Sequence, residues 1–326
     1  MAHRQTTLAS SPPSLRRGGL HMSRNWEAQF TTWAQPPADT ETQRCENAIT
    51  AIRNAVANSP KLSRRSIKVF PHGSFRNRVN VRHDSDVDVG VLCDDVFLTL
   101  YPPGKSDADF GNTQGGYPFS QFKTELEEAL VAKFGRNAVR RGDKAFDIHE
   151  NSYRVDADVT PFFEYRHYAE SGGYLCGVAL ISDSGGRIVN YPERLLEDWP
   201  QIPQHYENGV AKNESTARAF KGLVRILKCL RNEMAEAGIA ASQPIPGFLI
   251  ESMTWNVPDS CFKHPTWDQR VQAVLLHLWS NTKDDATCQE WAEVNDIKYL
   301  FRPSQKWTRA QAYAFVDAAW SYVGVR

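Results

Sequence analysis

Two aspartates, two residues apart and preceded by a glycine–serine pair, are the residues of this sequence best suited to chemistry. Asp86 and Asp88 alternate with apolar residues between Ser85 and Cys93, which predicts a half-buried strand. Residues two apart on a strand project from the same face, so the two carboxylates would repel each other without a cation between them. Mg²⁺ suits that position because it prefers oxygen ligands and leaves room for water and phosphate, and Mn²⁺ is the alternative ion.

The glycine–serine pair, Gly73 and Ser74, supplies groups that could hold the phosphate end of a nucleotide. Ser74 precedes Asp86 by twelve residues. Glycine lets the backbone approach a ligand closely, and a serine hydroxyl with the backbone N–H groups of a helix start can bind phosphate oxygens. An Asp-x-Asp pair alone is more often a solvated strand end. The glycine–serine pair at this spacing, with a further strand aspartate downstream, favours a metal and nucleotide site instead.

A second strand with two aspartates on one face is expected between Tyr153 and Thr160. Asp156 and Asp158 alternate there with valine and alanine. An unpaired buried carboxylate is costly, so a polar face on a core strand needs a partner. If this strand lies beside the first, one of its aspartates completes a cluster of three carboxylates around the metal.

Asp158 is the preferred third carboxylate. Pro161 is expected to end the strand, and metal-site residues often lie near strand ends. Asp158 is closer to that end than Asp156. Asp156 is instead interpreted as an ion-pair partner of Arg154 or Lys144.

The composition and length exclude several classes of protein. The chain has 326 residues, 41% of them hydrophobic, which suits one large or two ordinary domains. A formal net charge of zero argues against a protein that mainly binds long nucleic-acid duplexes. The apolar runs are too short to span a membrane, and the N-terminus shows no secretory signal. Six scattered cysteines predict buried or free thiols in a reducing compartment, so we expect a cytoplasmic protein.

Hydrophobic periodicity and turn residues predict an α+β protein with strands mainly in its first part and helices in its last. The expected strands are Ser66–Pro71, Ser85–Cys93, Ala138–Arg141, Ala145–Ile148, Tyr153–Thr160, Tyr174–Ile181 and Arg187–Val189. One helix is expected from Asp39 until Pro60 stops it, and the others are Phe75–Asn80, Phe119–Phe134, Asn213–Glu236, Pro246–Trp255, Trp267–Trp279 and Thr308–Tyr322. Asp94–Tyr117 is expected to be a long irregular insertion. The chain then divides into a disordered tail (1–24), a core with an N-terminal helix (25–205) and a helical domain (206–326).

The long helix expected to end at Glu236 carries a one-sided row of basic residues. These are Arg218, Lys221, Arg225, Lys228 and Arg231. Such a row is commonly a solvated helix face. It would equally neutralise phosphates held at the metal cluster. The sequence leaves both interpretations open.

The motifs described above resemble those of the polymerase-β-like nucleotidyltransferases: Gly73-Ser74, Asp86-Val87-Asp88 and Asp158-Val159-Thr160-Pro161. Downstream segments narrow the resemblance: Asn190-Tyr191-Pro192, Lys212-Asn213, Arg218-Ala219-Phe220-Lys221, Val224-Arg225-Ile226-Leu227-Lys228 and Ile245-Pro246-Gly247-Phe248-Leu249-Ile250-Glu251. Together these segments are similar to the bacterial cyclic GMP-AMP synthase/DncV-like nucleotidyltransferases (CD-NTases), relatives of animal cyclic GMP-AMP synthase and oligoadenylate synthetase. The resemblance extends from about Thr40 to the C-terminus.

The resemblance implies a bilobal fold: a nucleotidyltransferase core with a mixed, mainly antiparallel sheet and helices, a C-terminal helical lobe, and ATP and GTP bound in the cleft. It implies catalytic residues that are also the Mg²⁺ ligands: Asp86, Asp88 and Asp158. Gly73 and Ser74 would contact the donor triphosphate. Lys228 would contact the phosphates from the helical lobe. Many relatives have serine at the position of Gly247, so a hydroxyl contact is missing there and Gly247 is left out of the site.

The implied activity is the synthesis of a cyclic di- or trinucleotide second messenger by a two-metal mechanism, with release of pyrophosphate, in antiphage signalling. A separate effector protein would read the product, and the enzyme would be a monomer that does not bind a membrane. No cysteines match the zinc ribbon of animal cyclic GMP-AMP synthase, so direct activation by DNA is not expected. Another polymerase-β-like reaction stays open as the alternative: linear 2′-5′ oligoadenylate synthesis, RNA tailing, or adenylylation of a small molecule or protein. The bases, the linkage and the ring size also stay open.

Overall fold

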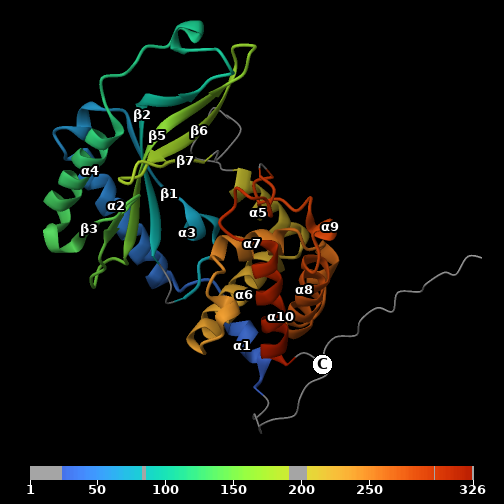
Figure 1. The fold of residues 1–326 in the computed structure, drawn as a ribbon. Coiled ribbons are helices and arrows are strands. Elements are labelled where there is room, and N and C mark those ends of the chain that lie inside the picture. Colours follow the sequence, from blue (N-terminus) through green and yellow to red (C-terminus); the bar gives the residue numbers. More distant parts are fainter. Residues whose placement is uncertain (1–23, 83–85, 191–203, 297, 325–326) are drawn as a thin grey trace, which may run out of the picture.

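A seven-stranded sheet is the framework of the first part of the chain (Figure 1). The computed structural model describes residues 24–82, 86–190, 204–296 and 298–324. The strand order is β1-β2-β5-β4-β3, with β6 beside β5 and β7 beside β6. The strands are β1 (Ile67–Pro71), β2 (Val87–Leu100), β3 (Val139–Arg141), β4 (Phe146–Ile148), β5 (Ala157–Tyr168), β6 (Tyr174–Ile181) and β7 (Arg187–Asn190). Among these described strands only β2 and β5 pair in parallel, so the predicted mixed, mainly antiparallel sheet is confirmed.

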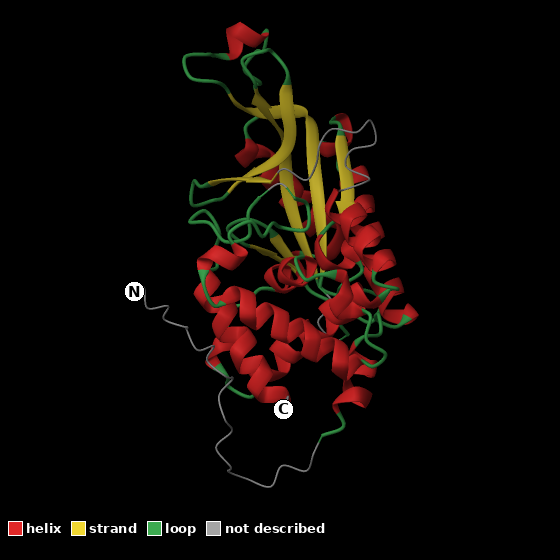
Figure 2. Ribbon diagram, turned by 90° about the vertical axis from the view of Figure 1, so that its right-hand side faces the viewer, coloured by secondary structure: helices red, strands yellow, loops and turns green. Residues whose placement is uncertain are grey.

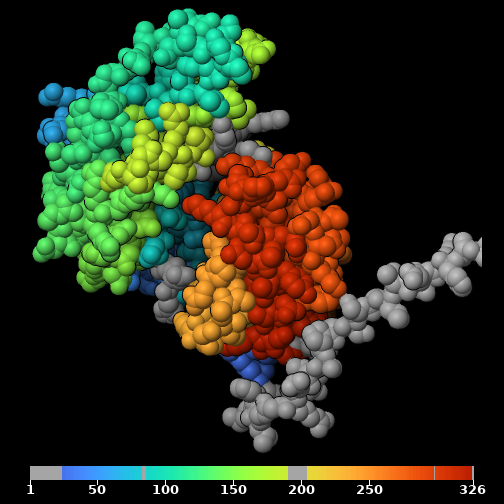
Figure 3. Space-filling model, in the orientation of Figure 1, coloured from blue at the N-terminus to red at the C-terminus, as the bar shows by residue number. Residues whose placement is uncertain are grey.

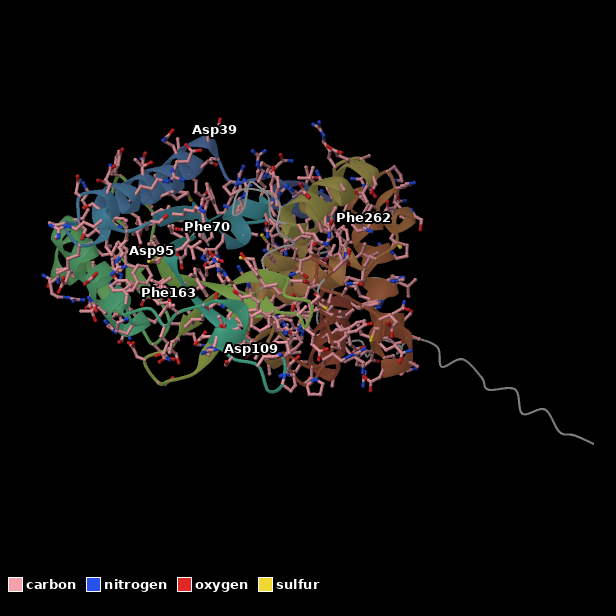
Figure 4. The ribbon with its side chains drawn as sticks, turned by 90° about the horizontal axis from the view of Figure 1, so that it is seen from above. Asp39, Phe70, Asp95, Asp109, Phe163 and Phe262 are labelled. Atoms are coloured by element: carbon pink, nitrogen blue, oxygen red, sulfur yellow. The ribbon has the colours of Figure 1, made fainter. Side chains whose placement is uncertain are left out.

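The helices form two groups in different halves of the molecule (Figures 1 and 2). α2 (Asp39–Ala57) and α4 (Phe119–Phe134) pack on one face of the sheet, and the short α3 (Gly73–Asn77) follows β1. The second group holds α1 (Trp26–Trp33), α5 (Gln204–Ser215), α6 (Ala219–Glu236), α7 (Gly247–Trp255), α8 (Trp267–Thr282), α9 (Asp285–Cys288) and α10 (Arg309–Val323). Each half has its own hydrophobic core, and Figure 4 labels Phe163 in the first and Phe262 in the second.

Periodic apolar residues account for the two helices on the sheet. In α2 the predicted stripe is buried: Cys45, Ile49, Ile52 and Val56. The prediction that α4 ends at Gly135 is confirmed, and this glycine has a φ of 84°, which other residues rarely adopt. Because α2 and α4 cover one face of the sheet, polar strand residues can project only from the other face.

Two central strands begin later and extend further than the sequence predicts. β2 begins at Val87 and β5 at Ala157, so Asp86 and Asp156 precede the strands that were expected to contain them. β5 continues through Pro161, so the expectation that this proline ends the strand is wrong. β4 pairs with β5 as far as Val159 and β6 pairs only from Phe163, so the proline lies where no strand is bonded on that side. β2 likewise continues to Leu100 and takes the first seven residues of the expected insertion, 94–100. The remainder contains only a 3₁₀ turn, Asp107–Phe110, within the described chain.

The long helix predicted from Asn213 is in fact two helices, α5 and α6. Ala217 and Arg218, between them, have positive φ angles of 51° and 66°, which break the helix. Thr216 lies beside this break and its hydroxyl accepts a hydrogen bond from the Phe220 N–H at 3.1 Å, while Arg218 is the N-cap residue of α6. The predicted start of the helix at Asn213 is therefore wrong, and its predicted end at Glu236 is confirmed.

α1 belongs to the helical half although it comes first in the chain. Phe30 is fully buried among α6 and α8 residues. We retain the division near residue 205 as a proposal, with α1 as the segment that crosses it. The predicted tail, apart from Arg24, and the Tyr191-Pro192 part of the motif lie outside the described residues. No helix in the described ranges is long and apolar enough to cross a membrane.

Candidate active site

Asp88 and Asp158 lie directly opposite each other on the parallel strands β2 and β5. Their neighbours Val87, Val89 and Val159 are completely buried in the core formed with α2 and α4, so the two aspartates project from the other face. The adjacency of the two strands, on which the three-carboxylate prediction depended, is therefore present. In the space-filling view a hollow separates the sheet-bearing half from the helical half, with blue-green atoms at its floor (Figure 3).

The two facing carboxylates hold protons more tightly than ordinary aspartates. Burial raises the pKa of Asp88 to about 6, and Lys228 acts in the opposite direction. Burial also raises the pKa of Asp158 to about 6, and the charges of Asp88, Asp147 and Asp86 raise it further. A bound cation would stabilise two carboxylates that are buried side by side in this way.

Asp147 is a carboxylate of this group that the sequence analysis missed. It lies on β4 directly opposite Asp158, so Asp88, Asp158 and Asp147 form one row across three strands. A side-chain hydrogen bond joins Asp147 to Asp158 and helps to raise the pKa of Asp158. The strand that contains Asp147 was predicted. A single aspartate in a strand of three residues has no partner at a spacing of two, so the pattern that identified the others was absent.

Asp86 lies at the edge of the group. It is exposed and precedes β2, and its charge acts on Asp158 and on Cys45. It also lines a polar pocket of about 390 Å³ together with residues of α2 and of the loop before β5: Thr40, Glu41, Arg44, Glu150, Val155 and Asp156. A second pocket, of about 460 Å³, lies between α2 and α4 and contains none of these aspartates.

The donor atoms in this row suit a hard divalent ion such as Mg²⁺. Carboxylate oxygens are its preferred ligands, and a cation would relieve the repulsion that raises the pKa values of Asp88 and Asp158. Within the described ranges, no three His, Cys, Asp or Glu side chains are grouped closely enough to hold a metal ion. The Asp88–Asp158 pair fits the ion, and Asp86 would have to move toward it to complete the predicted set.

Gly73 lies against the Asp88 carboxylate at the start of α3. Its φ is 63°, and a Cβ atom at this position would lie 2.0 Å from Asp88 Oδ2. The N–H of His72 also donates to the backbone carbonyl of Asp88 at 3.0 Å. The structure therefore brings the predicted glycine–serine pair to the predicted carboxylates, with Ser74 half-buried in the first turn of α3.

Lys228 enters the site from α6 in the helical half. Its side chain is buried, and Nζ donates to the carbonyl of Val79 at 3.1 Å. Its charge acts on Asp88 and lowers the pKa of that carboxyl against the effect of burial. A Cβ atom at Gly247 would lie 3.1 Å from Lys228 Cε, so a serine there would crowd the lysine.

Most of the basic row on α6 is not a solvated face. Lys221, Arg225 and Lys228 are all less than one-tenth exposed, so the solvated interpretation is wrong for these three residues. Arg218 is exposed, as that interpretation expects.

Asp156 takes no part in the row. It precedes β5, accepts a hydrogen bond from the Glu150 N–H and lies 4.0 Å from the ring of His149. Its charge also acts on Arg154, one of the two partners considered from the sequence.

Comparisons with known proteins agree with this architecture. Residues 207–324 match the model of the cGAS/DncV-like nucleotidyltransferase C-terminal helical domain. A cyclic dipyrimidine nucleotide synthase CdnE of Legionella pneumophila is 42% identical over 306 residues, covering 93% of this chain and 99% of that protein. The CdnE of the same description from Cecembia lonarensis is 39% identical over 303 residues, with the same coverage. The solved CdnE cyclic dinucleotide synthase of Elizabethkingia meningoseptica, with GTP and Apcpp, superimposes with a TM-score of 0.73 at 30% identity, covering 92% of this chain and 99% of that one.

The fold is that of a nucleotidyltransferase. The identities above, which extend over nearly the whole chain, show which kind: this protein belongs to the bacterial cGAS/DncV-like nucleotidyltransferases (CD-NTases). The resemblance inferred from the sequence motifs is confirmed.

Proposed function

We propose that this protein joins nucleoside triphosphates into a cyclic di- or trinucleotide second messenger and releases pyrophosphate. The observation that carries the proposal is the pairing of Asp88 with Asp158, with Gly73 packed against Asp88. ATP and GTP are the predicted substrates. The relatives' names include a dipyrimidine synthase and a dipurine synthase, the latter from Elizabethkingia meningoseptica at 33% identity, so the test must include all four nucleotides.

The proposed reaction is attack by the 3′ or 2′ hydroxyl of one nucleotide on the α-phosphorus of another. Mg²⁺, when bound, supplies charge stabilisation at the attacking and leaving oxygens. Asp86, Asp88 and Asp158 are the proposed ligands, and Asp158 is also the proposed proton acceptor from the attacking hydroxyl. Gly73 and Ser74 position the donor triphosphate, and Lys228 stabilises charge on its phosphates. A second round in the same cleft closes the ring.

Incubation with the four nucleoside triphosphates and Mg²⁺, followed by mass spectrometry, tests the proposal. The expected result is a cyclic product that resists phosphatase and is absent when Asp86→Asn and Asp88→Asn are combined in a folded variant. A linear 2′-5′ product, or turnover only when RNA, a small molecule or a protein is added, would instead support the alternative nucleotidyltransferase. An undiminished yield from the double variant would overturn the site assignment.

We propose in addition that the product acts in antiphage signalling through a separate effector protein in the cytoplasm, and that the enzyme is a monomer. Light scattering of the purified protein tests the oligomeric state. Infection of cells that carry the synthase with its effector, or with the double variant, tests the signalling role, and equal phage sensitivity of the two strains would contradict it.

A further inference from the structure

A group of cations around Tyr206 has no part in the mechanism above. The guanidinium of Arg76 lies 4.4 Å from the centre of the Tyr206 ring, and Lys221 Nζ lies 5.1 Å from the same ring. Arg76 belongs to α3 and Lys221 to α6, so the two cations come from opposite halves of the protein. The group therefore joins α6 to α3, the helix whose first residue, Gly73, lies against Asp88.

Lys221 is a buried cation that lacks an acidic partner. It is 9% exposed, and among the described residues its ammonium makes no hydrogen bond or ion pair. Glu251, an acid that acts on it, is held instead by His205 Nε2 at 2.9 Å. Burial lowers the pKa of Lys221, and the charges of Arg78, Arg225 and Arg76 lower it further. An unpaired buried charge is costly, so an anion at this position would be strongly favoured.

Arg225, one turn further along α6, differs from Lys221 because its charged group has hydrogen-bond partners within the protein. Its guanidinium donates to the carbonyl of Ala34 at 2.9 Å and to the carbonyl of Arg78 at 2.8 Å. These backbone carbonyls satisfy its donors, so Arg225 fastens α6 to the segments that end α1 and α3. Lys221 has no such role within the described part of the chain.

We infer that Lys221 and Arg76 bind the outer phosphates of the nucleoside triphosphate whose α-phosphate lies at Asp88 and Asp158. This inference rests on the proposed function. Lys221 and Lys228 are seven residues apart, so they leave α6 on one face about 10 Å apart along its axis. Lys228 is the cation at the carboxylate end of the site, and Lys221 is the cation at the far end.

Binding of inorganic tripolyphosphate with Mg²⁺, measured by calorimetry, tests the inference without requiring turnover. Lys221→Met, which removes the charge and keeps the length, should weaken binding about 10- to 100-fold, the usual effect of losing a charge-assisted contact. Lys221→Arg should restore most of the affinity. Lys283→Met is the matched control, because Lys283 lies 5.6 Å from the Trp279 ring at the end of α8 and its loss should leave binding unchanged.

Thermal unfolding of each variant separates a binding defect from a folding defect. If Lys221→Met binds tripolyphosphate as tightly as the wild type, the inference is overturned. If Lys221→Met does not fold, Lys221→Arg decides: a folded Lys221→Arg that fails to bind tripolyphosphate would also overturn the inference. The inference would also be overturned if formation of the cyclic product required Lys221 but binding of tripolyphosphate did not. If the wild-type protein makes no cyclic product but tripolyphosphate binding still depends on Lys221, the proposed function fails and this inference stands.

Discussion

Gly73 and Asp88 are in direct contact, so position 73 has no room for a side chain. A Cβ atom would lie 2.0 Å from Asp88 Oδ2, and the φ of 63° disfavours other residues independently of space. The contact couples the turn expected to hold phosphate to a carboxylate expected to hold metal. Neither can be displaced without the other.

Gly73→Ala should therefore reduce product formation about 100-fold, the effect expected when a catalytic group is displaced by about 1 Å. The initial rate and the melting temperature are the measurements. Gly104→Ala is the matched control, because Gly104 also has a positive φ, of 78°, but has no atom within 4 Å of the added Cβ. If Gly73→Ala loses no more activity than Gly104→Ala, the contact between Gly73 and Asp88 does not contribute to catalysis.

The raised pKa values of Asp88 and Asp158 predict how stability depends on pH. Both are raised from 3.8 to about 6, so the folded protein holds these protons more tightly than the unfolded chain. Without metal, the free energy of unfolding should fall as the pH rises from about 4 to about 6. Mg²⁺ should accordingly raise the melting temperature more near pH 7 than near pH 5. Calorimetric melting with and without Mg²⁺ measures this difference.

A variant separates the contribution of these carboxylates to stability and to the Mg²⁺ response from that of the rest of the protein. Metal-free Asp158→Asn should melt about 2 °C higher than the wild type near pH 7, because the repulsion is removed, and it should respond less to Mg²⁺. Glu290→Gln, an exposed substitution, is the control and should leave both properties unchanged. A Mg²⁺ response of wild-type size in Asp158→Asn would argue against a metal at this position.

Asp147 should support the reaction through Asp158. Asp147→Asn keeps a group that can hydrogen-bond to Asp158 but changes its charge, so we expect a loss of about 10-fold in rate and a higher Mg²⁺ requirement. Asp158→Asn should abolish product formation. Rates measured over a Mg²⁺ titration distinguish the two roles. Equal and complete loss in both variants would make Asp147 a ligand in its own right.

Local patterns predicted the parts of the site but not their arrangement. Alternation of apolar and polar residues located the strands of Asp88 and Asp158, because a strand with one buried face has an apolar residue at every second position. The order of strands in a sheet depends on long-range packing, so the pairing could be stated only as a condition. Asp147 was missed for the same reason, since only the sheet brings it opposite Asp158.

The burial of Lys221 and Arg225 could not be predicted from the sequence either. A basic stripe looks the same whether it meets water or another part of the protein. Its environment is set by α3 and by the end of α1, which lie more than 140 residues away in the chain, as the 147- and 191-residue separations of the Arg225 contacts show.

The placement of α1 has a consequence for how the protein can be divided. Phe30, stacked on Trp26 with ring centres 5.2 Å apart, fills part of the hydrophobic interior built by α6 and α8. A fragment that starts at residue 206 would leave that space open to solvent. The helical lobe would need residues 24–35 supplied as a separate peptide, or joined to its C-terminus through a linker, to fold independently.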